Sequence, residues 1–174
     1  MCIRDSQNIP GLVGACIYSV CCLMLFTSST VYHFVQEPVL KNLFKILDHI
    51  SIYFLIAGTY TPVCIYFFSG FWKWGVLITV WLMALVGIVI KLFLIRAPRW
   101  LTAGIYLTMG WSAIFAIKEI LEKMHCGALV WLLIGGLLFT FGAVVYIIKR
   151  PNFFPGVFGF HEVWHIFVIL GALS

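Results

Sequence analysis

Three histidines in this chain have the residue type best suited to bind a metal ion. His161 and His165 are four residues apart, which places both side chains on one face of a helix, about 6 Å apart along its axis. Two histidines so placed can bind one metal ion, and His33 can supply a third nitrogen from another segment. Three neutral nitrogen ligands leave the fourth position of tetrahedral zinc for water, as in catalytic zinc sites. The sequence therefore predicts a zinc site formed by His33, His161 and His165.

Two further polar residues could take part in chemistry at such a site. Zinc lowers the pKa of a bound water towards about 7, which makes hydroxide available at neutral pH. Asp48 could hold that water or orient a histidine, and Ser29, one turn before His33, could position the water or a substrate carbonyl. A simpler interpretation of Asp48 stays open, as a carboxylate that stabilises the start of a helix. His49 and His125 are interpreted as packing residues.

The segment around the histidine pair also admits a second interpretation. His161-Glu162-Val163-Trp164-His165 matches H-E-x-x-H, the zinc metalloprotease motif in which the glutamate is the general base. Such proteases take a further ligand downstream, and only nine residues follow the motif. An intramembrane protease stays an alternative. The other interpretation is that only the H-x-x-x-H spacing matters and that Glu162 faces away from the metal.

The elements that must position these residues are apolar. Of the 174 residues, 63% are hydrophobic and 10% are charged, where a soluble domain has about 25% charged residues. Apolar runs longer than about 18 residues recur along the chain, which is typical of membrane-spanning helices. The net charge of +5 comes from basic residues scattered between these runs, so a membrane protein is favoured and a nucleic-acid partner is not. The six cysteines have no C-x-x-C spacing, and we expect no disulfides.

The apolar runs predict an all-α fold, an integral membrane helical bundle with six spans. The predicted spans are residues 11–35, 46–68, 74–95, 100–117, 126–148 and 157–174. Short connections make successive helices antiparallel neighbours, so we expect a single transmembrane domain over residues 11–174. Residues 1–10 are expected to be a leader unrelated to this domain, and both ends of the chain indicate a piece of a longer protein.

The charges between the spans predict the orientation in the membrane. Seven basic residues fall in the odd-numbered connections, and four fall in the even-numbered connections and the N-terminus. The seven are Lys41, Lys45, Lys91, Arg96, Arg99, Lys149 and Arg150, and the four are Arg4, Lys73, Lys118 and Lys123. The odd-numbered connections are therefore expected in the cytoplasm. His33, Asp48, His161 and His165 all flank these connections, which predicts a metal site near the cytoplasmic face.

Several longer motifs resemble those of the bacterial hemolysin III proteins, which belong to the progestin and adipoQ receptor family. They are SSTVYH at residues 28–33, LDHISIY at 47–53, IAGTYTP at 56–62, YLTMGW at 106–111 and HEVWHIFV at 161–168. The resemblance covers nearly everything after residue 10, in order. It implies a seven-helix protein of the bacterial plasma membrane, of which the six spans here match the second to the seventh. The family's first helix is missing, and its last helix is cut short.

The resemblance also implies a site and a range of functions. By the family's pattern, His33, His161 and His165 are the zinc ligands, and Asp48 and Ser29 lie beside the zinc-bound water. The implied chemistry is a zinc-dependent amide hydrolysis like that of alkaline ceramidases, with membrane lipids as partners and a lipid amide or acyl bond as substrate. A pore-forming, cytolytic haemolysin with a structural zinc is the alternative, although no span has the polar stripe of a water-filled pore. A receptor of membrane lipid state is a third candidate.

Overall fold

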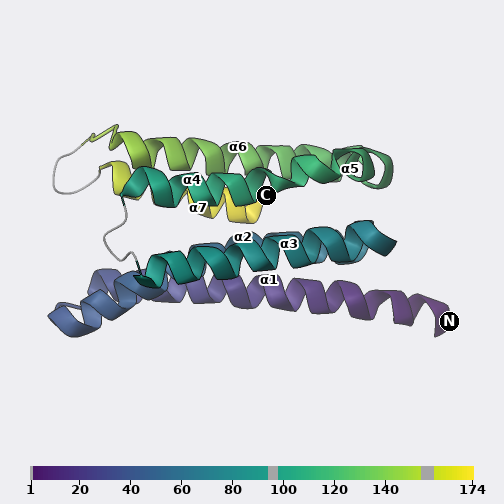
Figure 1. Cartoon of the computed structure of the whole chain (residues 1–174), viewed down its shortest axis with the longest axis horizontal. Helices are drawn as coiled ribbons and strands as arrows, with labels where there is room; N and C mark the ends of the chain where they lie inside the picture. The colour runs from purple at the N-terminus through teal and green to yellow at the C-terminus, as the bar shows by residue number, and fades with distance from the viewer. Residues whose placement is uncertain (1, 94–97, 154–158) are drawn as a thin grey trace. The chain divides into compact units, whose positions relative to one another are not determined.

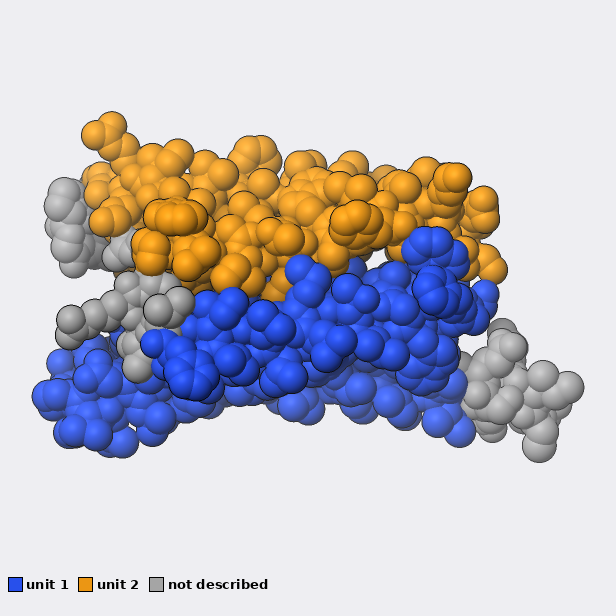
Figure 2. All heavy atoms as spheres, in the orientation of Figure 1, with its two compact units in different colours: residues 1–96 blue, residues 97–174 orange. Residues whose placement is uncertain are grey.

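The computed structural model describes residues 2–93, 98–153 and 159–174. These residues form helices and contain no strand, so the predicted all-α fold is confirmed. The chain divides into two compact units, Met1–Arg96 and Ala97–Ser174, which Figure 2 shows in separate colours. We call them the first unit and the second unit.

The first unit contains three long helices, α1 (Cys2–Phe34), α2 (Pro38–Phe67) and α3 (Gly70–Phe93). They alternate in direction, and α2 packs against both of the others (Figure 1). The first turn of α2 is stabilised by Glu37, whose carboxylate accepts hydrogen bonds from two backbone N–H groups of that turn, while Pro38 stands at the first helical position. A glycine with φ of 54° at Gly70 permits the tight reversal into α3.

The interior of the first unit is built on α2. Tyr53, Leu55 and Cys64 of this helix are almost completely buried. Small residues let the neighbouring helices approach closely. A Cβ atom added at Gly14 of α1 would lie 2.8 Å from the Cα atom of Pro62, so α1 lies directly against this part of α2.

The second unit contains α4, a 3-10 turn η1, α5, α6 and α7. Their bounds are Arg99–Trp111, Ser112–Ala116, Ile117–Lys123, Cys126–Ile148 and Phe160–Leu173. The first three elements follow one another without a break, and α6 returns in the opposite direction and packs against α4 and α7 (Figure 1). Glycines set the contact between α6 and α7. A Cβ atom at Gly171 would lie 3.0–3.2 Å from ring atoms of Phe139.

Five of the helical stretches are long and apolar enough to cross a membrane. The sixth, α7, has 14 residues and is about 21 Å long, where a hydrocarbon core is about 30 Å thick. Large apolar side chains lie exposed on every long helix, for example Leu23, Leu82 and Leu133. An apolar outer surface of this kind is expected where helices face lipid.

Two helices extend further than their apolar runs. The second helix begins at Pro38 rather than at residue 46, because Glu37 caps it, so Lys41 and Lys45 lie on α2 rather than in a connection. The fourth predicted span continues past Ile117 to Lys123, where a Glu119–Lys123 ion pair of 3.8 Å spans one helical turn. The basic residues that flank these spans therefore lie on helix ends.

Candidate metal centre

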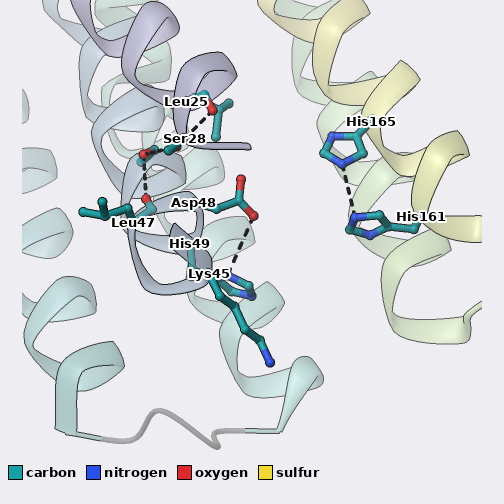
Figure 3. A network of polar contacts seen from close by, with 9 residues as sticks. Leu25, Ser28, Lys45, Leu47, Asp48, His49, His161 and His165 are labelled. Atoms are coloured by element: carbon teal, nitrogen blue, oxygen red, sulfur yellow. Dashed lines mark hydrogen bonds and ion pairs between the residues drawn. The ribbon is translucent and has the colours of Figure 1, made fainter. Parts of the chain in front are cut away.

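The histidine pair lies at the beginning of α7. His161 is the second residue of this helix, and His165 follows one turn later. The two Nε2 atoms are 3.2 Å apart, and Figure 3 shows the rings facing each other. Trp164 packs against both rings, with centroid distances of 5.4 Å to His161 and 4.6 Å to His165. The tryptophan therefore limits the rotation of both histidines.

The distance between these nitrogens fits a shared metal ion. Two nitrogen ligands at 2.0–2.1 Å from a tetrahedral zinc ion lie about 3.3 Å from each other. The observed 3.2 Å between His165 Nε2 and His161 Nε2 agrees with this value, and it is also an ordinary hydrogen-bond length between two imidazoles. The pair is thus compatible with two positions of a zinc site without rearrangement of α7.

Glu162, between the two histidines, stabilises the start of α7. Its Oε2 atom accepts a hydrogen bond of 2.8 Å from the backbone N–H of Gly159. The next N–H along the chain, that of Phe160, donates to Oδ1 of Asn152 at 3.0 Å. A negative charge at this position also interacts favourably with the helix dipole. This arrangement supports the interpretation in which the H-x-x-x-H spacing matters and the glutamate is not a general base.

In the first unit, the three predicted site residues lie together. Asp48 is 3% exposed, and Ser29, which is 8% exposed, is a hydrogen-bond neighbour of its carboxyl group. His33 stands in the last turn of α1 and interacts electrostatically with the same carboxyl group. The Oδ2 atom of Asp48 lies 3.9 Å from Nδ1 of His49 (Figure 3). A serine, a histidine and an aspartate thus converge where α1 ends beside α2.

Two features of Asp48 indicate a functional rather than a structural carboxylate. It lies about three turns inside α2, and no acidic residue occupies the first turn, so the interpretation as a helix-start carboxylate does not hold. Its Oδ1 atom is buried and has no hydrogen-bond partner among the described residues. A buried polar atom without a partner costs about 1–3 kcal/mol. Ionisable groups within spanning helices are usually retained for function.

Two buried serines that the sequence analysis did not identify hold α1 against α2 at this point. Ser28 Oγ and Ser51 Oγ are 3.0 Å apart, and Ser51 donates to the carbonyl oxygen of Leu47 at 2.6 Å (Figure 3). Because the Ser51 hydrogen is used in that bond, Ser28 is the donor whenever the two hydroxyls are bonded to each other. The two serines neighbour Ser29 and Asp48 in space and sequence, so they fix the position of both. Their only signal in the sequence is a pair of adjacent serines within an apolar run.

The predicted ligands thus fall into two groups, one in each unit. His33 belongs to the first unit with Ser29 and Asp48, and His161 and His165 belong to the second. That the three histidines bind one ion stays a prediction, as does the position of the site relative to the membrane.

The helices and their apolar surfaces define a multi-pass α-helical membrane protein. The family model described as haemolysin-III related matches residues 3–174. The chain is 36% identical over 163 residues to the hemolysin-3 homolog of Bacillus subtilis, a match covering 94% of this chain and 74% of that protein. It is also 36% identical over 162 residues to hemolysin-3 of Bacillus cereus, covering 93% and 71%. The chain belongs to the haemolysin III family, as its motifs predicted.

A more distant similarity connects the chain to the wider progestin and adipoQ receptor family. The adiponectin receptor protein of Drosophila melanogaster is 33% identical over 147 residues, a match that covers 75% of this chain and 33% of that protein. The predicted membership of this wider family is thereby confirmed as well.

Proposed function

We propose that this protein is a zinc-dependent membrane hydrolase that cleaves a lipid amide or related acyl bond. In this proposal His33, His161 and His165 bind the zinc ion. The observation that carries the proposal is the buried Asp48 carboxylate, whose Oδ1 atom has no partner among the described residues while Ser29 and His33 lie beside it. The spacing of the histidine pair on α7 supports it independently, because the pair already has the separation of two zinc ligands.

Zinc, when bound, polarises a substrate carbonyl and lowers the pKa of water. Asp48 Oδ1 then accepts the proton of the attacking water and returns it to the leaving nitrogen. Ser29 orients the Asp48 carboxyl group, and the Ser28–Ser51 contact keeps α1 and α2 in the register that this requires. Trp164 keeps both histidines of α7 in place for ligation.

The proposal includes a location and a route for the substrate. The basic residues of the odd-numbered connections favour a site near the cytoplasmic face of the bacterial plasma membrane. A lipid substrate would reach the site from the bilayer, along the apolar outer faces of the helices.

The test combines metal analysis with lipid hydrolysis on the full-length protein in nanodiscs. His161→Ala should lose both zinc and turnover of an N-acyl lipid panel, because a ligand is removed. Asp48→Asn should keep zinc and lose about 10²–10⁴-fold in turnover, because the proton acceptor is removed while the shape is kept. Lys118→Gln, on α5, is a control that should change neither quantity. Stoichiometric zinc with no hydrolysis across a broad lipid panel would contradict the proposal, as would full turnover by Asp48→Asn.

A pore-forming protein with a structural zinc is the second candidate, because the similar Bacillus cereus protein is named hemolysin-3. This candidate expects dye leakage from liposomes that survives Asp48→Ala and fails in His161→Ala. The hydrolase expects any leakage to follow lipid turnover and therefore to disappear in both variants. Parallel leakage and lipidomics measurements on these two variants separate the candidates.

A further inference from the structure

The first unit contains a second buried charge that the proposed hydrolysis does not use. Lys91 stands in the last turn of α3 and is 7% exposed. None of the described residues gives its ammonium group a hydrogen bond or an ion pair. The charged group that acts on it is Lys45 of α2, which carries the same sign. Two lysines from neighbouring helices therefore share one end of this unit without a counter-ion from the described residues.

Such an arrangement is costly in an apolar bundle. A buried ammonium group without a partner loses its hydration, and charged groups in spanning segments are rare for this reason. The carbonyl end of α3 offers a partial negative charge, but this interaction is weak and does not offset repulsion from a second lysine. An anion between Lys45 and Lys91 would remove both the desolvation cost and the repulsion.

The acidic residues described in the first unit are engaged elsewhere. The Glu37 carboxylate accepts hydrogen bonds from the N–H groups of the first turn of α2. Asp48 faces His49, Ser29 and His33, and Figure 3 shows the Lys45 side chain extending away from it. Neither carboxylate is therefore available to compensate the two lysines.

The same end of α2 has further basic character. Lys41, Lys45 and His49 follow one another at four-residue spacing and therefore share one face of the helix. Lys41 lies over the ring of Tyr32 at 5.9 Å, so it is held at this end as well. A basic face beside a buried lysine is the arrangement with which transmembrane helices bind phosphate headgroups.

We propose that Lys45 and Lys91 bind a phosphate group at this end of α2 and α3. The group is carried by an anionic lipid or is free phosphate. Lysine binds phosphate as a point charge, and contact between α2 and α3 places one such charge on each side of the site. None of the proposed zinc ligands takes part, so the binding site stands whether or not the zinc centre is catalytic.

Native mass spectrometry of the full-length protein can test this site. The probes are phosphatidylglycerol and phosphatidylcholine with the same acyl chains, and inorganic phosphate as a competitor. The wild-type protein should retain phosphatidylglycerol in preference to phosphatidylcholine. Lys91→Met should weaken phosphatidylglycerol binding about fivefold, and the double variant with Lys45→Met about twenty-five-fold, from the usual contribution of one basic residue.

A control and a conservative variant separate binding from folding. Lys73→Met removes a lysine near the start of the same helix, where its ammonium group lies over the Trp74 ring, and should leave phosphatidylglycerol binding unchanged. Lys91→Arg should keep most of the binding. Competition by inorganic phosphate would assign the site to free phosphate, and binding without competition would assign it to a lipid headgroup. Equal retention of both lipids with no effect of phosphate, or equal losses in Lys73→Met and Lys91→Met, would overturn the proposal.

Discussion

Each unit joins two of its helices by the same polar contact, yet buries it to a different depth. In the first unit, the Trp81 indole on α3 donates to Thr61 Oγ1 on α2 at 3.2 Å. In the second unit, the Trp111 indole on α4 donates to Thr140 Oγ1 on α6 at 3.1 Å. Each threonine in turn donates to the carbonyl oxygen one turn earlier in its own helix. Thr61 is 2% exposed, whereas the Thr140 contact lies near the surface.

This difference extends to the two groups of site residues. The buried polar residues of the first unit are Ser28, Ser29, Asp48, Ser51, Thr61 and Lys91, whereas those described in the second are Thr102 and Ser112. Asp48 and its neighbours are therefore fixed by the interior packing of α1 and α2. The histidine pair, by contrast, is half-buried on a short helix whose position depends on contacts with α6. The first unit has a polar centre that its own packing orders, and the second unit has a pair of ligands at a helix start.

The largest effect is expected from overfilling the interior of the first unit. A Cβ atom at Gly87 would lie 2.7 Å from Cδ1 of Tyr53, a ring that is 1% exposed and cannot move aside. Gly87→Leu should therefore lower the free energy of unfolding by about 3 kcal/mol, as measured by denaturation in mixed micelles. Gly104→Leu in α4 is the matched control, because no atom lies within 4 Å of its added Cβ. Equal losses in the two variants would contradict the account of a tightly filled first unit.

A smaller effect should distinguish the two tryptophan–threonine contacts. Thr61→Val leaves a buried indole N–H without its acceptor and should cost about 2 kcal/mol of unfolding free energy. Thr140→Val removes the same bond near the surface and should cost about 0.5 kcal/mol, because water or headgroups can replace the hydroxyl. Thermal unfolding of the two variants measures both values. Losses in the reverse order would show that burial does not distinguish the units in this way.

The smallest of the three effects concerns the start of α7. Glu162→Ala removes the acceptor for the Gly159 N–H and should cost about 1 kcal/mol of unfolding free energy, while zinc content and lipid turnover stay within about twofold of wild type. Glu162→Gln keeps an acceptor oxygen and should recover part of the stability. Loss of turnover by orders of magnitude in Glu162→Gln, with stability retained, would instead make this glutamate a general base.

The sequence alone predicts the fold class because the apolar runs leave no other solution. It also predicts that His161 and His165 face each other, since four-residue spacing on a helix is a local property. The early start of α2 was not predicted, because Glu37 and Pro38 are polar or helix-breaking residues outside the apolar run. That start changes the interpretation of Asp48, which lies well inside the helix rather than at its beginning.

The remaining features depend on contacts that the local sequence does not contain. The Ser28–Ser51 contact requires a particular rotation of α1 against α2, which periodicity in either helix does not determine. Glu162 could have been recognised, since Gly159 three residues earlier forms the capping pattern, but the same letters also complete H-E-x-x-H. Only the hydrogen bond to the backbone distinguishes the two interpretations.

The most direct test of the proposed zinc centre is zinc content together with zinc K-edge X-ray absorption on the purified full-length protein and its His33→Ala variant. The account predicts one zinc ion per chain, with three imidazole nitrogens at about 2.0–2.1 Å. In His33→Ala the zinc should be lost, or retained with only two imidazoles. A wild-type protein without zinc, or a His33→Ala variant with unchanged zinc content and an unchanged spectrum, would contradict it.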